Sequence, residues 1–364
     1  MNVLNVFYNF NQGGVERLGV TVANTMAKSR SNDVHVCIIT EDYSSSLVET
    51  FSQDVHLLFL QKKQHFRKIN YIKQLSSYIK KHNIKIVHVH QGELMPLYAA
   101  VKVLCPRIKL FFTVHDTYIF SELSRHNQII STLICEKMIA ISDAVVNDIK
   151  KNKVKDEKIV RIYNGIDFGV FNIHKHSINT NSEPIHISNV ARFFPKKKGQ
   201  DILIEAISML KSSGINVTVS FAGAEPQGVK GEFERMDLLV EKYDLKDNIK
   251  FLGNINDVPA LLGKTDIFCI PSRYEGFGIS AVEALAMGIP CVASNIPGLN
   301  EVVNSTELGE LFEVGNSTDL AEKLKKVVLN LREYEPEKIR ANVHRRFSIE
   351  SMVEQLQLAY GGKR

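Results

Sequence analysis

The chain has 364 residues, which is more than one hydrophobic core usually holds, so we expect two domains. Hydrophobic residues make up 44% of the chain and charged residues 23%, as in an ordinary globular protein. No apolar run approaches the roughly 18 residues of a membrane span, and the start, MNVLNVFYNF, lacks the basic segment of a secretory signal. We therefore expect a cytoplasmic protein, which can still lie peripherally on the inner face of the cytoplasmic membrane.

The first half of the chain alternates short β-rich runs with longer helical patterns. Strands are expected at 2–8, 33–40, 85–89, 109–115, 137–141 and 159–163, and helices at 15–28, 94–104 and 128–136. Such alternation predicts βαβ units and a parallel sheet with helices on both faces. The first domain is expected to span residues 1–168.

A polar stretch rich in His, Asn, Ser and Thr, residues 169–184, interrupts the pattern and indicates a linker. The alternation then resumes, with strands at 185–191, 216–222, 249–252, 267–270, 290–293 and 310–314. Helices are expected at 200–212, 230–243, 257–264 and 318–331, and one begins near residue 278. The fold class is therefore α/β, with a second doubly wound domain at 185–345 and a helical tail at 346–364. Ligands of such sheets bind at the carboxyl ends of the strands, so we expect the site in a cleft between the domains.

The five cysteines suggest a reducing compartment, because their number is odd and none forms a Cys-x-x-Cys pair. Several lie in apolar runs. We expect buried free thiols at Cys37, Cys105, Cys135, Cys269 and Cys291.

Positive charge is concentrated in one segment of the first half. Residues 1–170 hold 22 Lys and Arg against 15 Asp and Glu, whereas the remainder holds 23 against 25. No acidic residue lies between Asp54 and Glu93, and the basic residues of 62–85 accompany apolar residues at helical spacing. The basic residues are Lys62, Lys63, Arg67, Lys68, Lys73, Lys80, Lys81 and Lys85, and the apolar ones are Ile69, Ile72, Leu75 and Ile79. This amphipathic helix has either an ordinary solvated face or a docking surface for anionic lipid or a phosphorylated acceptor. Nucleic acid is not expected as a partner, because no recognition module accompanies the charges.

The segment PSRYEGFGISAVEAL, residues 271–285, is the most informative stretch. A strand ends at Pro271, a loop carries Glu275, and a helix begins near Gly278 with N–H groups that suit a phosphate. Glu275 and Glu283 can both face a bound ligand there, since carboxylates accept hydrogen bonds from sugar hydroxyls. The alternative is an ordinary helix start with a solvent-facing glutamate.

A second loop, NVARFFPKKKGQ at residues 189–200, follows the first strand of the second domain. Arg192 and Lys198 can neutralise a diphosphate there without a metal. Taken alone, the lysines at 196–198 are more typical of a solvated charge run. In the first domain, Gly13 and Gly14 allow a tight turn beside a ligand before a helix.

The first domain also carries histidines at strand ends. His115 ends a strand and is expected to point toward the ligand, although a lone histidine is often structural. His88 and His90 share a strand face, but no third metal ligand is evident. No Asp-x-Asp pair occurs, which disfavours a Mg²⁺-held nucleotide sugar, and no Gly-x-Gly-x-x-Gly occurs, which disfavours a dehydrogenase.

Together these motifs resemble those of the family 4 retaining glycosyltransferases, over most of the chain. The resemblance rests on Gly13-Gly14, Val114-His115-Asp116, Asn164-Gly165-Ile166-Asp167, Arg192 with Lys198, Glu275 with Glu283, and Pro297-Gly298-x-x-Glu301. It implies a GT-B fold of two Rossmann-like domains, with an acceptor-binding first domain and a nucleotide-sugar-binding second domain. It also implies a C-terminal helix, near 348–360, that packs back on the first domain.

The resemblance further implies a role for each matched residue. Glu275 is expected to bind hydroxyls of the donor hexose, Glu283 the ribose, and Arg192 and Lys198 the leaving diphosphate. His115 is expected to contact the sugar near its reacting carbon. The remaining donor contacts are expected from Gly13, Gly14, Asn254, Ile255, Phe277, Gly278 and Ile279.

The expected function is retaining transfer of a hexose or N-acetylhexosamine from a UDP- or GDP-sugar, without a metal or other cofactor. The acceptor is expected to be a glycan or a lipid-linked molecule of bacterial surface polysaccharide or lipopolysaccharide synthesis. Two alternatives stay open: a nucleotide-sugar epimerase, and a non-catalytic nucleotide-sugar-binding protein of the same fold.

Overall fold

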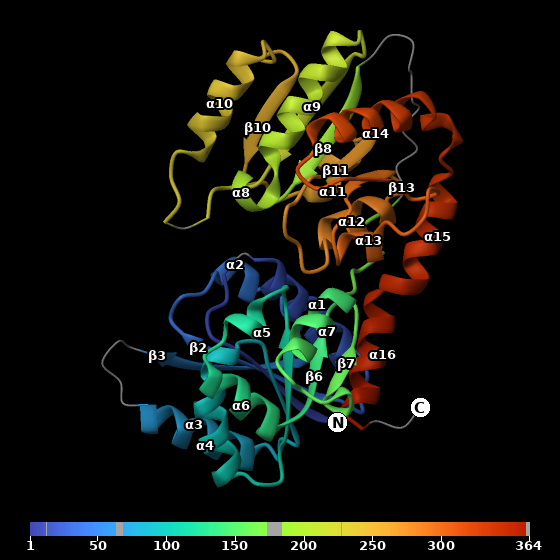
Figure 1. The fold of residues 1–364 in the computed structure, drawn as a ribbon. Helices are drawn as coiled ribbons and strands as arrows, with labels where there is room; N and C mark the ends of the chain where they lie inside the picture. Colours follow the sequence, from blue (N-terminus) through green and yellow to red (C-terminus); the bar gives the residue numbers. More distant parts are fainter. Residues whose placement is uncertain (12, 63–67, 173–183, 227, 362–364) are drawn as a thin grey trace. The chain divides into compact units, whose positions relative to one another are not determined.

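The computed structural model describes residues 1–11, 13–62, 68–172, 184–226 and 228–361 (Figure 1). The chain divides into two compact units, each with its own parallel sheet, which confirms the predicted α/β class. The first unit comprises Met1–Ile166 and Phe347–Arg364, and the second comprises Asp167–Arg346. The change of unit thus falls at Ile166, slightly before the expected end at residue 168. Most of the expected linker, residues 173–183, lies outside the described residues.

The sheet of the first unit has seven described strands in the order β3-β2-β1-β4-β5-β6-β7, and all neighbouring pairs are parallel. The strands are β1 (Asn2–Phe7), β2 (Asp33–Thr40), β3 (Val55–Lys62), β4 (Ile86–Val89), β5 (Lys109–Val114), β6 (Cys135–Ala140) and β7 (Ile159–Arg161). The helices are α1 (Gly14–Ala27), α2 (Ser45–Val48), α3 (Lys68–Lys81), α4 (Met95–Leu104), α5 (Ile119–Glu122), α6 (Arg125–Ile134), α7 (Asp143–Lys151) and α16 (Ile349–Ala359), with 3-10 turns η1 (Gly92–Leu94) and η2 (Asp156–Lys158). Central strands such as β1 and β4 are almost wholly buried because both of their faces are covered.

Several expectations for this unit were wrong. Strand β3 was not predicted, because its sequence VHLLFLQK runs directly into the basic stretch and its last residue, Lys62, was assigned to the basic helix. The helix expected at 128–136 instead occupies Arg125–Ile134, since Ser124 caps its start through the N–H of Asn127. The basic helix predicted over 62–85 is shorter: α3 spans Lys68–Lys81, with Leu75 and Ile79 buried, whereas Lys62 ends strand β3 and Lys85 lies beyond the helix.

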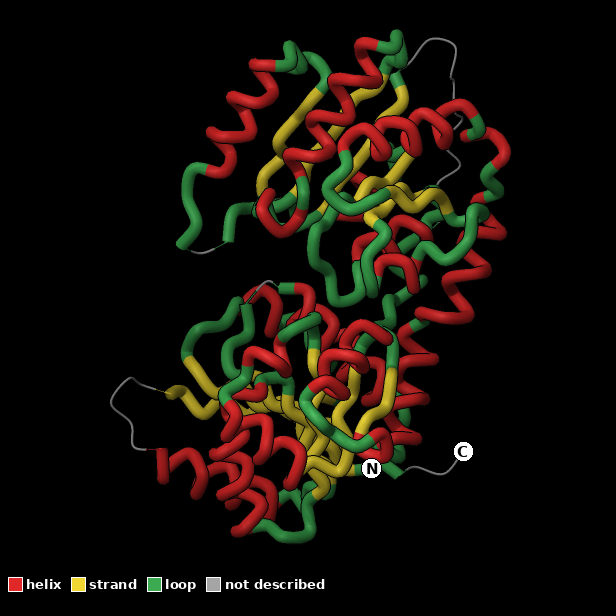
Figure 2. Tube along the Cα trace, in the orientation of Figure 1, coloured by secondary structure: helices red, strands yellow, loops and turns green. Residues whose placement is uncertain are grey.

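The second unit has six described strands in the order β10-β9-β8-β11-β12-β13, again all parallel. The strands are β8 (Ile185–Val190), β9 (Val217–Ala222), β10 (Ile249–Gly253), β11 (Ile267–Ile270), β12 (Cys291–Ser294) and β13 (Gly309–Phe312). The helices are α8 (Pro195–Lys198), α9 (Gln200–Ser212), α10 (Glu232–Lys242), α11 (Val258–Leu262), α12 (Ile279–Ala286), α13 (Leu299–Val302), α14 (Ser317–Leu329) and α15 (Pro336–Phe347), with a 3-10 turn η3 (Leu331–Glu333). Figure 2 shows the strands of each unit side by side with helices outside them.

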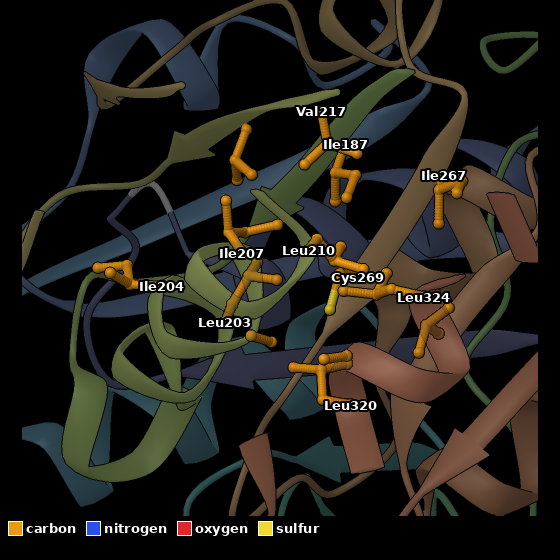
Figure 3. Close-up of a cluster of buried hydrophobic side chains, with 14 of the residues drawn as sticks. Ile187, Leu203, Ile204, Ile207, Leu210, Val217, Ile267, Cys269, Leu320 and Leu324 are labelled. Atoms are coloured by element: carbon orange, nitrogen blue, oxygen red, sulfur yellow. The ribbon is translucent and has the colours of Figure 1, made fainter. Parts of the chain in front are cut away.

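The core of the second unit lies between one face of its sheet and the helices α9 and α14 (Figure 3). Leu203, Ile207 and Leu210 recur at helical spacing along α9 and are at most 2% exposed. Leu320 and Leu324 of α14 meet them across the cluster. Each such side chain contributes about 1.5–3 kcal/mol when it is removed from water, so this layer holds the strands that carry the site.

The strand order of each sheet reverses at one point. In the first unit, β1 has β2 on one side and β4 on the other; in the second, β8 lies between β9 and β11. Connections leave such neighbouring strands toward opposite faces, which opens a crevice at their carboxyl ends. The loops after β1 and β4, and after β8 and β11, are therefore the places for a ligand in each unit.

The C-terminal segment belongs to the first unit, where α16 contacts α1. The N–H of Ile166 donates to the carbonyl of Phe347 at 2.9 Å, and the N–H of Ile349 donates back to Ile166 at 2.9 Å. A Cβ on Gly165 would lie 2.8 Å from the Cα of Ile349, so only glycine fits this crossing. The glycine of the Asn-Gly-Ile-Asp motif therefore serves chain packing.

All five cysteines are buried and free. Burial raises the pKa of the Cys135 thiol to about 12 and that of Cys37 further still, so these groups act as small apolar side chains. Among the described residues, no helix combines the length and the apolar character needed to cross a bilayer.

Candidate functional site

The loops after β8 and β11 meet at the switch point of the second sheet. Lys198 ends the short helix α8, and its Nζ lies 2.5 Å from Oε2 of Glu275, on the loop after β11. Only 13% of the lysine side chain and 16% of the glutamate side chain are exposed. The hydroxyl of Ser272 donates to the same carboxylate at 3.4 Å. A cation and an acceptor of sugar hydroxyls are thus fixed side by side.

An ion pair that sequence reasoning missed joins these two loops. Arg273 makes two hydrogen bonds of 2.8 Å to the two carboxylate oxygens of Asp201, at the start of α9. Its guanidinium also donates to the carbonyl of Pro195, and its backbone N–H donates to the carbonyl of Lys197, both at 2.8 Å. Bidentate pairs of this kind fix geometry strongly. Because Arg273 adjoins the Glu275 motif, its position in the sequence was a signal that could have been used.

Close packing also fixes the junction between α8 and α9. Gly199 has φ +69°, and a Cβ there would lie 1.9 Å from the carbonyl oxygen of Pro271. The buried side-chain amide of Gln200 donates to the carbonyl of Arg192 at 3.1 Å. Lys198 is therefore held by backbone geometry on both sides, which gives its ammonium a fixed position.

The start of α12 supplies N–H groups at the same edge of the sheet. Gly278 precedes the helix with φ +88°, and a Cβ there would lie 2.4 Å from Leu299. Glu283 lies four residues after Ile279, about one turn inside the helix. The buried ring of Phe277 anchors the loop before the helix. The first N–H groups and the dipole of α12 form an environment that favours an anion.

The motif at 297–301 packs against the loop that carries Glu275. A Cβ on Gly298 would lie 2.9 Å from the carbonyl oxygens of both Glu275 and Gly276. The N–H of Gly298 donates to Glu301 at 3.2 Å, which closes the turn that leads into α13. The motif thus shapes the backbone that carries Glu275.

Three further predicted residues lie at the carboxyl edge of this sheet. Arg192 follows β8, and its side chain is exposed. Asn254 and Ile255 follow β10, where Asn254 is exposed and Ile255 half-buried. The structure brings Lys198 and Glu275 into direct contact, whereas these three are placed only at the shared edge.

In the first unit, Gly13 and Gly14 begin α1 after β1. A Cβ on Gly13 would lie 2.2 Å from the carboxylate at the end of the flexible Glu16 side chain, which can move aside, so the chain's own packing does not require glycine there. A Cβ on Gly14 would have no atom of the described chain within 4 Å, and its backbone lies outside the left-handed region. Neither sterics nor conformation within the described chain explains the glycine at position 14.

His115 follows β5 and contacts another histidine. Its Nε2 lies 2.9 Å from Nδ1 of His90, which follows the neighbouring strand β4. Desolvation by burial lowers the pKa of His115 to about 4. His88, two residues before His90, instead bonds to the hydroxyls of Tyr360 and Thr113, both at 2.6 Å. Among the described residues, no three His, Cys, Asp or Glu side chains form a metal-binding set.

Comparisons with known proteins identify the family. Residues 12–169 match the model described as Glycosyltransferase Family 4, and residues 170–345 match Glycosyl transferases group 1. The chain belongs to the family 4 glycosyltransferases. The two matches together span most of the sequence, as the motif resemblance predicted.

Individual relatives are distant but span most of the chain. The glycosyltransferase is 27% identical to N-acetyl-alpha-D-glucosaminyl L-malate synthase of Bacillus anthracis, over 79% of this chain and 77% of that one. It is 26% identical to the capsular polysaccharide biosynthesis glycosyltransferase CapH of Staphylococcus aureus, over 83% of each. The crystal structure of Anabaena Alr3699/HepE with UDP covers 99% of this chain and 100% of its own, with TM-score 0.86 and 20% identity. That structural likeness confirms the GT-B fold.

Proposed function

We propose that this glycosyltransferase moves a hexose or N-acetylhexosamine from a UDP- or GDP-sugar to a glycan or lipid-linked acceptor. The observation that carries the proposal is the contact of Lys198 with Glu275 at the switch point, beside the start of α12. The UDP complex of the Anabaena protein and the capsular polysaccharide role in the name of the Staphylococcus relative support the donor and acceptor classes.

The chemistry follows from charge. As the bond between the anomeric carbon and the phosphate oxygen breaks, negative charge builds on the diphosphate. Lys198, Arg192 and the N–H groups of Phe277, Gly278 and Ile279 would stabilise that charge without a metal. Glu275 would accept bonds from the sugar hydroxyls, and Glu283 from the ribose. The acceptor oxygen then bonds to the anomeric carbon and passes its proton to a leaving phosphate oxygen.

Retention of configuration is part of the proposal, with the acceptor attacking from the face that the diphosphate leaves. Proton NMR of the first product formed would show the anomeric configuration directly. A product of inverted configuration, or a covalent sugar trapped on any side chain, would contradict this mechanism.

Calorimetric titration tests the donor site. UDP and GDP are titrated, each with and without Mg²⁺, into the wild type and Lys198→Ala. We expect one of the two nucleotides to bind without Mg²⁺ and to bind at least about tenfold more weakly to the variant, a loss of about 1.4 kcal/mol. Asp237→Asn, a change in the same unit on α10, serves as a control with unchanged binding. Absence of binding by both nucleotides would refute the proposed UDP- or GDP-sugar donor.

The basic face of α3 is proposed to dock on an anionic membrane surface. Lys73, Lys80 and Lys81 are exposed there; Lys63 and Arg67 lie outside the described residues, and the side chains of Lys62 and Lys68 are likewise not described. Each exposed lysine near an anionic surface contributes about 1 kcal/mol.

Vesicle binding tests this proposal with two variants of equal charge change. Replacing Lys73, Lys80 and Lys81 with Gln should weaken sedimentation with phosphatidylglycerol vesicles. The control replaces exposed lysines elsewhere in the first unit, namely Lys151, Lys153 and Lys155, with Gln. Equal binding by the two variants would refute docking through α3.

A further inference from the structure

Two histidines at neighbouring strand ends form a bonded pair. His90 comes one residue after β4 and His115 one residue after β5, and the two strands are parallel neighbours. The Nδ1 of His90 and the Nε2 of His115 are 2.9 Å apart, and the ring centroids are 5.1 Å apart. In the sequence, His90 stands out only as a possible metal ligand beside His88, with no third ligand evident.

The ring of His90 is held on its other side by an aromatic stack. The ring of Phe7 lies 4.3 Å away, with an interplanar angle of 10°. Phe7 is itself fixed, because it is 1% exposed and presses against α1. A Cβ on Gly19 of α1 would lie 2.5 Å from the tip of the Phe7 ring. The plane of His90 is therefore set by β1 and α1, and the direction of its Nδ1 toward His115 is fixed with it.

The hydrogen bond between the two rings couples the position of the His115 proton to the tautomer of His90. Burial lowers the pKa of His90 well below its ordinary value and that of His115 to about 4, so both rings are neutral near neutral pH. One ring then donates and the other accepts. If His90 donates, the proton of His115 lies on its Nδ1; if His90 accepts, that Nδ1 is a bare acceptor.

The nitrogens that face away from this bond are also informative. The Nδ1 of His115 and the Nε2 of His90 are buried, and neither has a hydrogen-bond partner among the described residues. A buried polar atom without a partner costs about 1–3 kcal/mol, so its presence calls for an explanation. A hydroxyl of a bound sugar would satisfy the Nδ1 of His115.

We propose that His90 is a positioning residue for glycosyl transfer: it fixes the ring orientation and the tautomer of His115. It thereby decides whether His115 offers a donor or an acceptor to a sugar hydroxyl. The inference rests on the proposed contact between His115 and the donor sugar, and it adds a residue that makes no substrate contact itself.

A double-mutant cycle tests the coupling. His90→Phe keeps an aromatic ring against Phe7 but cannot bond to His115, whereas His90→Asn places an amide near the former Nδ1. Each is made alone and together with His115→Ala, and kcat and KM for the donor are measured. We expect His90→Phe to lower kcat/KM about tenfold or more in the wild-type background and to cause no further loss beside His115→Ala. His90→Asn should recover part of the loss.

The outcomes separate this inference from the function on which it rests. Wild-type activity of His115→Ala would refute the proposed role of His115 itself. If His115→Ala strongly lowers kcat/KM and His90→Phe lowers it by the same factor in both backgrounds, the positioning role of His90 is refuted, while the role of His115 stands.

A spectroscopic measurement covers the case in which His90→Phe does not fold. Nitrogen-15 NMR of the wild-type imidazoles reports the tautomer of each ring. A single tautomer of His115 that becomes mixed in His90→Asn supports the inference, and a mixed population already in the wild type overturns it.

Discussion

Gly14 offers a test in which folding and function should change in opposite directions. It is the first residue of α1, its backbone is not left-handed, and a Cβ there would meet no described atom within 4 Å. Alanine is a better helix former than glycine by at most about 1 kcal/mol. Gly14→Ala should therefore leave the free energy of unfolding unchanged or slightly higher.

The effect on the donor should be the reverse. If the diphosphate approaches the backbone at the start of α1, a methyl group on residue 14 occupies space that the phosphate needs. Overpacking of this kind costs about 1–3 kcal/mol, which corresponds to a rise in donor KM of roughly 5- to 150-fold. Gly14→Ser, with a larger side chain, should raise the KM further.

Steady-state kinetics with varied donor and varied acceptor measure the two KM values, and urea unfolding measures the stability of each variant. We expect the KM of the acceptor to change little in either variant. Donor KM values at the wild-type level in both variants, with intact folding, would refute the reasoning that glycine 14 is required by a ligand. A fall in stability instead would mean that the chain itself demands the glycine.

Three further results are expected. Arg273→Lys, which loses the bidentate contact with Asp201, should raise donor KM about tenfold while the circular dichroism spectrum stays native; unchanged kinetics would show that the bridge does not position Lys198. Gly165→Ala should lower the unfolding free energy by about 2 kcal/mol or more in urea titration, because its Cβ collides with backbone atoms of the C-terminal segment, and a wild-type midpoint would contradict that packing. Because the pKa values of His90 and His115 are lowered by burial, the unfolded chain binds more protons than the folded chain below about pH 6.5. The free energy of unfolding should therefore be highest above that pH and should fall as the pH drops toward about 4, by up to about 1.4 kcal/mol per pH unit for each histidine. A free energy of unfolding that stays constant between pH 7 and about 5 would exclude burial of the two rings in the neutral form.

The architecture was largely predictable because it rests on local patterns. Side chains on one face recur every 2.0 residues along a strand and every 3.6 residues along a helix. These two periods, read from the apolar residues, identified most elements of both sheets. The loops that carry Lys198 and Glu275 could be recognised because each follows a strand and precedes a helix. Strand β3 escaped this reasoning, since its last residue, Lys62, was assigned to the basic helix that follows.

The tertiary structure alone decided which residues meet. Lys198 and Glu275 are 77 residues apart, and His90 and His115 are 25 apart, so no local pattern could show that their side chains touch. The order of the strands brings them together, and strand order depends on how the helices cover the sheet. The same holds for the glycines that the sequence marked alike at 14, 165 and 298: a Cβ at 165 or 298 would collide with backbone atoms, whereas a Cβ at 14 would meet no described atom beyond its own chain neighbours. Sequence thus indicated the kind of chemistry, and folding determined which of the candidate side chains meet, because contacts between distant residues are a property of the packed chain.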